Sequence, residues 1–152
     1  MRFTNTCDYA IRALIYLVRR HSSSEYALIA EVARECHIPK KYLEQVLLSL
    51  GRAGILESKK GHHGGYRLAK PPTEISLGDA LRAVNGRLVP LPAWVESRDA
   101  RSNELAQTGL GQVLIRMRDV VREVLDNATL ADLDRGNVRA PHTESIRHFY
   151  QI

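Results

Sequence analysis

The sequence is poor in cysteine and has no long apolar run. Its 152 residues include only two cysteines, Cys7 and Cys36. Two distant cysteines do not form a disulfide framework, which argues against a small secreted domain. No apolar run approaches the roughly 18–20 residues of a membrane span, and arginines interrupt the apolar positions near the N-terminus, unlike a signal peptide. We therefore expect a cytoplasmic protein of a reducing compartment, with no membrane partner.

The sequence also lacks the patterns of an enzyme. It contains no Ser/His/Asp order, no phosphate-binding glycine loop and no cluster of metal ligands at a characteristic spacing. His62 and His63 are adjacent, but neighbouring side chains in a turn point in different directions, and no further His or Cys lies at ligand spacing. We expect neither an enzyme nor a metal site.

What the sequence does contain is positive charge, gathered in one stretch. The chain has a net charge of +5 and a pI near 9.5. Residues 39–70 hold seven lysines or arginines and two glutamates, a net charge equal to that of the whole chain. Such a patch suits a nucleic-acid partner. An ordinary solvated hairpin beside a core helix is the alternative.

The same stretch predicts a helix followed by a two-stranded hairpin. Pro39 suits a first helical turn, and Leu43, Val46, Leu47 and Leu50 recur at helical spacing until Gly51 and Gly54. Two short strands then flank a turn whose glycines, at 61, 64 and 65, need positive φ or close backbone approach. Upstream, residues 28–33 predict a short helix and residues 35–39 a tight connection. This is the order of a winged helix-turn-helix.

Further helices are predicted on both sides of this winged helix-turn-helix, which we call the head. Residues 5–20 predict an amphipathic helix, capped by Asn5 or Thr6, and residues 77–84 a short helix capped by Ser76. The apolar face of the first helix would consist of Cys7, Ala10, Ile11, Leu14, Ile15 and Val18. The strongest helical pattern covers residues 105–126, and its apolar stripe is wider than a small head needs to cover. We expect the stripe to pack against the same helix of a second copy of the chain, with packing inside one chain as the alternative. The stripe consists of Leu110, Val113, Leu114, Met117, Val120, Val121, Val124 and Leu125.

The predicted fold class is mainly α with a small β-wing, arranged as a winged helix-turn-helix head plus a long dimerisation helix. Residues 1–84 would form the DNA-binding domain, 85–104 a loop, 105–133 the dimerisation helix and 134–152 a mobile C-terminal tail. A two-fold dimer would hold two recognition helices about 34 Å apart, one turn of DNA, and would bind a palindromic operator.

With these motifs, the sequence resembles the IscR, NsrR and CymR family of bacterial transcriptional regulators (the Rrf-two family). The resemblance covers roughly residues 1–133, and its most specific part is YLEQ at residues 42–45 followed by a G-x-x-G-G-Y wing. The other matching residues are 1–4, 8–14, 38–41, 50–56, 75–80 and 127–130. The resemblance implies a homodimeric DNA-binding regulator, a repressor, whose N-terminal helix packs against the partner's long helix. A winged-helix protein-interaction module without operator binding is the alternative.

The resemblance and the residue types together indicate the DNA-binding residues. Lysine suits phosphate or guanine, Gln45 matches the donor and acceptor of adenine, and Glu44 can accept from cytosine. Each of these residues alone could equally be an ordinary exposed side chain. The helix contributes Lys40, Lys41, Tyr42, Glu44 and Gln45, and the wing contributes Lys59, Lys60, His62, His63, Gly64 and Gly65.

The resemblance does not extend to a cofactor. Many members carry three cysteines in the loop after the winged domain, where they hold an iron–sulphur cluster, and such clusters need thiolates. Here no cysteine follows Cys36, so we expect no cofactor. The signal stays open between a thiol switch at Cys7 and Cys36, a small-molecule pocket near Trp94 and a protein effector. Both cysteines could instead be buried hydrophobes, and a residual metal or cluster site using Asp8 is the weakest alternative.

Overall fold

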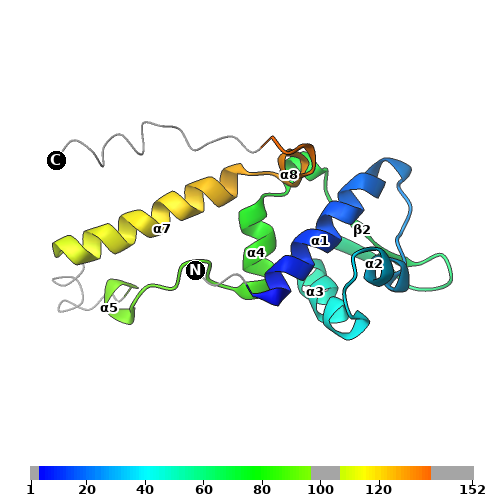
Figure 1. Cartoon of the computed structure of the whole chain (residues 1–152), viewed down its shortest axis with the longest axis horizontal. Coiled ribbons are helices and arrows are strands. Elements are labelled where there is room, and N and C mark those ends of the chain that lie inside the picture. Colours follow the sequence, from blue (N-terminus) through cyan, green and yellow to red (C-terminus); the bar gives the residue numbers. More distant parts are fainter. Residues whose placement is uncertain (1–3, 97–106, 138–152) are drawn as a thin grey trace.

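The computed structural model describes residues 4–96 and 107–137 (Figure 1). It confirms the predicted class, because the chain is mainly helical with one two-stranded antiparallel sheet. The predictions for residues 1–3, 97–106 and 138–152, including most of the C-terminal tail, lie outside the described residues. The helices are α1 (Asn5–Arg20), α2 (Ile29–Glu35), α3 (Lys40–Arg52), α4 (Leu77–Asn85), α5 (Ala93–Glu96), α7 (Gly109–Asn127) and α8 (Leu130–Arg135), the 3-10 turns are η1 (His21–Ser23) and η2 (Pro72–Glu74), and the strands are β1 (Leu56–Lys59) and β2 (Gly65–Leu68).

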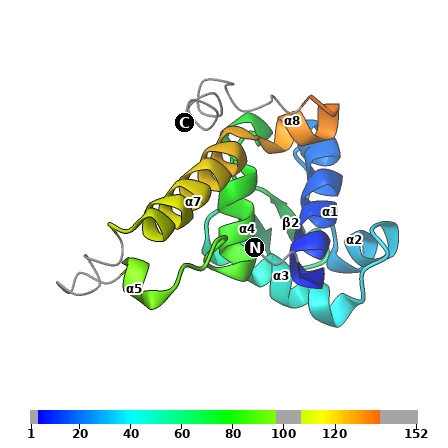
Figure 2. The same cartoon turned by 60° about the vertical axis from the view of Figure 1, so that its left-hand side comes forward.

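The elements form a head with one helix leaving it. In Figures 1 and 2, α4 stands between α1 and α7, and α7 extends away from the head on the side opposite the wing and α2. Along the described part of the chain, no helix combines the length and apolar character needed to cross a membrane.

The core of the head forms where α1, α2 and α3 meet. The predicted apolar face of α3 is confirmed, because Leu43, Leu47 and Leu50 are fully buried and Val46 is 1% exposed. Each such side chain contributes roughly 1.5–3 kcal/mol on burial. Val32 of α2 and Leu14 of α1 complete this first core cluster from the other two helices.

A second core cluster lies between α4 and α7. It contains Leu81 of α4, Leu125 of α7 and three residues of the segment predicted as a loop, Leu88, Val89 and Leu91. That segment also contains the short helix α5. The chain after α4 is therefore part of the core, because it covers the flank of α7 that faces the head.

Helix α1 has the predicted length, but its cap and its buried face differ from the prediction. Thr4, and not Asn5 or Thr6, is the N-cap, and its side chain accepts a hydrogen bond from the Cys7 backbone N–H at 3.4 Å. Ala13 and Leu17 are buried as well as the predicted Ala10 and Leu14. The buried face is wider because α1 contacts α3 on one side and both α4 and α8 on another.

The long helix is shorter than predicted. It begins after the N-cap Thr108 and ends at Asn127, because Ala128 is extended (φ −88°, ψ 113°). A capping box between Thr129 and Asp132 then starts α8, which includes residues that we had placed in the tail. Asp134 of α8 pairs with Arg19 of α1 at 2.7 Å, which ties α8 to the head.

Candidate nucleic-acid interface

The turn between α2 and α3 is held by backbone hydrogen bonds. The Ile38 N–H donates to the Ala33 carbonyl at 2.9 Å and the His37 N–H to the Arg34 carbonyl at 3.3 Å. This is the Schellman arrangement, which requires a left-handed residue, and His37 supplies it with φ 53°. The turn therefore sets the angle between the two helices by its backbone geometry.

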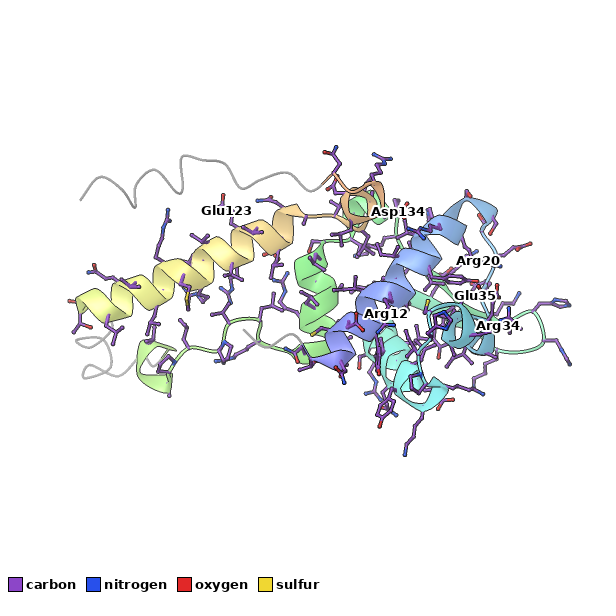
Figure 3. The ribbon with its side chains drawn as sticks, viewed as in Figure 1. Arg12, Arg20, Arg34, Glu35, Glu123 and Asp134 are labelled. Carbon is purple, nitrogen blue, oxygen red and sulfur yellow. The ribbon has the colours of Figure 1, made fainter. Side chains whose placement is uncertain are left out.

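Helix α1 supports the same turn through Arg12. The Arg12 guanidinium donates to the Cys36 carbonyl at 3.2 Å and pairs with Asp8 one turn earlier. It also lies 5.4 Å from the centre of the Tyr9 ring. Figure 3 shows Arg12 on α1, beside the end of α2 that carries Glu35. The N-terminal helix thus holds the end of α2 as well as packing against the core.

The outward face of α3 is polar and basic. All five predicted α3 residues, Lys40, Lys41, Tyr42, Glu44 and Gln45, are exposed. At about 100° per residue, the row most directly opposite the buried leucines also includes two positions that our sequence prediction missed. The complete row is Lys41, Gln45, Leu48 and Arg52, and Leu48 is 43% exposed.

Tyr42 connects the start of α3 to α1. It is 59% exposed, and its ring centre lies 6.3 Å from that of Tyr9. An aromatic pair at this distance adds about 0.5–1.5 kcal/mol beyond simple burial. Tyr42 therefore has a structural contact on one side while its remaining surface faces solvent.

The wing is a four-residue antiparallel pair closed by a glycine turn. Leu56 pairs with Leu68 and Lys59 with Gly65, so the turn contains residues 60–64. Lys59, Lys60, His62 and His63 are exposed, as a phosphate-binding wing requires. Gly61, with φ 105°, makes the turn at its outer end.

Gly64 and Gly65 have a different role from the exposed wing residues. Gly64 is buried, and a Cβ there would overlap the carbonyl oxygen of Lys59 across the turn. Gly65 has φ 130°, and a Cβ there would overlap the carbonyl of Ala27. Ala27 and Tyr66 form a bridge with two N–H···O bonds of 2.9 Å. The two glycines therefore let the wing close and lie against the head.

Tyr26 adds a second attachment for the wing, and sequence reasoning missed it. The Arg67 guanidinium lies 4.5 Å from the centre of its ring and the Lys59 ammonium 5.8 Å. The Tyr26 hydroxyl donates to Glu57 at 3.2 Å, and Glu57 pairs with Arg67 across the strands. The hydrogen bond from Arg67 lowers the pKa of Glu57, so this carboxylate stays charged to a lower pH than an ordinary glutamate would.

The two cysteines lie in different parts of the core. Cys7 is 2% exposed in the second cluster and Cys36 is 8% exposed in the first. Burial raises the pKa of the Cys36 thiol, and its sulfur contacts the Arg12 carbonyl at 3.6 Å. Both features favour a structural role for Cys36 within the core of the chain. Trp94 lies in α5, and its side chain is outside the described residues.

The apolar stripe of α7 divides into two rows. Leu125 is 7% exposed and packs in the second cluster, with Leu114 and Val121 beside it. The other row remains at the surface, where Leu110, Val113 and Met117 are 62%, 53% and 45% exposed. Val120 and Val124, which are half-buried, continue this outer row with alternating steps of three and four.

We expect Gly65→Ala to destabilise the attachment of the wing. The change combines a left-handed backbone with a clash against Ala27, and should lower the free energy of unfolding by roughly 2–4 kcal/mol. Urea unfolding followed by circular dichroism measures it. The matched control is Gly109→Ala, where a Cβ meets nothing within 4 Å. Equal stabilities of the two variants would contradict this role of Gly65.

We expect the Cys36 thiol to react slowly in the folded protein. The Cys7→Ser variant leaves Cys36 as the only thiol, and its rate with a disulfide reagent at pH 8 should rise sharply when urea exposes it. The physical reason is that burial removes both access and thiolate. A native-state rate equal to the rate in urea would show that Cys36 is available for redox chemistry.

Comparison with known proteins gives the family. Residues 3–135 match the Rrf2 family model, described as an iron-dependent transcriptional regulator. The chain is 31% identical over 133 residues to the HTH-type transcriptional regulator CymR of Bacillus subtilis, covering 88% of this chain and 89% of that protein. It is 32% identical over 145 residues to the HTH-type transcriptional regulator NsrR of Geobacillus kaustophilus, covering 92% and 95%.

Solved structures agree with the sequence relatives. The fold matches that of B. subtilis CymR, the global cysteine regulator, with a TM-score of 0.71 and 28% identity over 90% of this chain and 98% of that one. It matches IscR of T. potens with a TM-score of 0.69 and 26% identity, over 90% and 88%.

The residues of this chain do not fit an iron–sulphur cluster. Cluster irons need several thiolates, whereas the two cysteines here are buried in separate apolar clusters and none follows Cys36. Within residues 4–96 and 107–137, no three His, Cys, Asp or Glu side chains gather as a metal site.

One conclusion follows from the matching family model, from the relatives above 30% identity over most of both chains, and from the shared winged fold. The chain belongs to the Rrf2 family of winged helix-turn-helix transcriptional regulators, and is not an enzyme.

Proposed function

We propose that the chain represses transcription in the bacterial cytoplasm by binding a palindromic operator as a homodimer. The observation that carries the proposal is the exposed row of α3. The helix is held by its buried face in the core and by the Tyr9–Tyr42 contact with α1, and the basic wing follows it in the chain. A helix presented in this way fits a major groove, and the wing can follow the adjacent phosphates.

The α3 row combines groups for different base edges. Lys41 and Arg52 suit phosphate or guanine, and the Gln45 amide can pair with adenine. Leu48 is one turn beyond Gln45 on the same row, where its side chain can contact a thymine methyl group. Glu44 lies about 100° around the helix from Gln45, so we assign it to the edge of the groove.

The wing supplies affinity more than specificity. Lys59 and Lys60 are exposed on the strand and turn, and His62 and His63 form the tip. Lysine contacts with phosphate release counterions, which makes binding strongly dependent on salt. The cluster of Tyr26, Glu57 and Arg67 supports this role, because the Lys59 ammonium lies 5.8 Å from the centre of the Tyr26 ring and is oriented by that contact.

We assign dimerisation to the outer row of α7. Leu110, Val113 and Met117 expose apolar surface at heptad-like spacing, with Val120 and Val124 continuing the row. A stripe of this spacing is typical of a helix that packs against a parallel or antiparallel twin. Leu114, Val121 and Leu125 are already covered by the same chain, so we remove them from the predicted interface and give them the role of fixing α7 to the head.

A winged-helix module that binds another protein is the second candidate. It would leave the charge of residues 39–70 without a purpose, and it would select no DNA sequence. The first experiment below separates the two candidates.

Selection of genomic fragments by the purified chain should return a palindrome. Replacing Lys40 and Lys60 by alanine should weaken binding to all sequences and lower the salt slope by roughly one unit for each lost phosphate contact. Gln45→Ala should alter the preferred base at one position of each half-site. Arg135→Ala removes an exposed charge on α8, outside residues 39–70, and is the control that should change neither the salt slope nor the preferred base. No enriched sequence would favour the protein-binding module.

Charge on the outer row of α7 should separate the subunits. Val113→Asp with Met117→Asp should give a monomer in sedimentation equilibrium and should weaken operator binding, because a monomer contacts one half-site. Gln112→Asp places the same charge on another side of α7 and should remain a dimer. If the double variant stays dimeric, the interface lies elsewhere.

A further inference from the structure

The C-terminal end of α7 is joined to the start of α4 by backbone hydrogen bonds. The Leu77 N–H donates to the Ala128 carbonyl at 2.7 Å, and the Leu130 N–H donates to the Ile75 carbonyl at 2.9 Å. The two bonds form one isolated antiparallel bridge. In Figures 1 and 2, this end of α7 lies at the head and the other end points away from it. A single bridge fixes where α7 meets the head, but by itself it acts as a hinge.

A second attachment lies to one side of this bridge, on the face that α4 presents to α7. The Arg82 guanidinium of α4 pairs with the Asp126 carboxylate of α7 at 2.8 Å. Arg82 also pairs with Asp79, one turn earlier on α4, at 2.7 Å, and this contact holds the guanidinium in place on its own helix. We call Arg82 and Asp126 the cross-helix pair. Two attachments at separate points fix an angle between the helices that one bridge leaves free.

Gly78 provides the space in which the cross-helix pair forms. It is buried in the first turn of α4, and a Cβ there would overlap an Asp126 carboxylate oxygen and lie 3.1 Å from an Arg82 guanidinium nitrogen. Alanine at this position would therefore displace the carboxylate from Arg82. The helix itself would tolerate the change, since alanine favours a helix more than glycine does.

The long helix amplifies any change of angle at this joint. Asp126 and Val113 lie near opposite ends of α7, about 20 Å apart at 1.5 Å per residue. A rotation of about 10° at the cross-helix pair moves Val113 by about 3.4 Å relative to the head, which is the rise of one base pair. Val113 belongs to the outer row to which we assign the dimer contact. The same rotation would therefore displace the two heads of the dimer relative to each other.

We propose that Gly78, Arg82 and Asp126 determine which spacing between operator half-sites the dimer accepts. The inference rests on the proposed function, because it needs a dimer that reads two half-sites. A dimer whose heads are held at one angle matches one separation of half-sites along the DNA. The three are positioning residues, since they act through the angle of α7 and are not among the residues assigned to DNA contact.

The cross-helix pair and the proposed dimer contact occupy different sides of α7. At about 100° per residue, Asp126 lies roughly 160° around the helix from the outer row of Val113 and Met117. Substitution of Asp126 therefore leaves the dimer contact in place. Asp119 is the matched control, because its carboxylate pairs with Arg118 of the same helix at 2.8 Å.

The test measures affinity for versions of the selected palindrome that differ in half-site spacing by single base pairs. The wild type should prefer one spacing, and Asp126→Ala should reduce its preference over the neighbouring spacings by roughly two- to fivefold, the range expected for one half-exposed ion pair. Gly78→Ala should have the same effect, and adding it to Asp126→Ala should change nothing further, because it acts by displacing that carboxylate. Arg82→Lys should keep more of the preference than Arg82→Gln, and Asp119→Ala should match the wild type. Because a ratio of affinities is compared, a general loss of folded protein cancels.

Two results would overturn this inference while the proposed function stands. One is an unchanged spacing preference in Asp126→Ala and Arg82→Gln, which substitute half-exposed side chains and decide the matter even if Gly78→Ala does not fold. The other is a full additional effect of Gly78→Ala in the Asp126→Ala background. A wild type that selects no palindrome at all would instead overturn the proposed function, and this inference with it.

Discussion

The packing of α1 against the rest of the head is the interaction on which the other features depend. Ala10, Ala13 and Leu14 are fully buried, and two alanines on one face allow neighbouring helices to approach closely. The same helix contacts α3, α4 and α8. Through Arg12 and Tyr9 it also holds the turn before α3 and the first turn of α3. A shift of α1 would therefore move the candidate DNA-reading helix and the attachment of α7 together.

The wing depends on close backbone approach as much as on charge. Its basic side chains are exposed, but the pair of strands keeps its position because Tyr66 bridges to Ala27 and Gly65 leaves room for that bridge. Lys59 and Arg67 lie over the Tyr26 ring, and Arg67 also pairs with Glu57; these contacts fix the same side of the hairpin. Exposed ion pairs alone contribute little, so backbone pairing and the buried Leu56 and Leu68 account for most of the stability of the wing.

The two apolar rows of α7 lie in different environments, one packed in the second core cluster and one at the surface. Leu125 and its neighbours join the helix to α4 and the segment after it, while Val113 and Met117 leave an exposed apolar row, to which we assign the proposed dimer contact. In the proposed dimer, α7 would therefore connect the head of one subunit mechanically to the other subunit.

The helical class, the winged order and the exposed residues of α3 could be predicted from the sequence, because helical periodicity and glycine positions are local properties. The buried face of α3 was predicted residue by residue for the same reason. The break at Ala128, the split of the α7 stripe and the role of Tyr26 come from contacts between distant parts of the chain. A periodic apolar pattern shows that a face must be covered, but it does not show by which element. The Leu77 N–H donates to the Ala128 carbonyl where α7 ends, and the cation–π contacts around Tyr26 join residues that are distant in the chain.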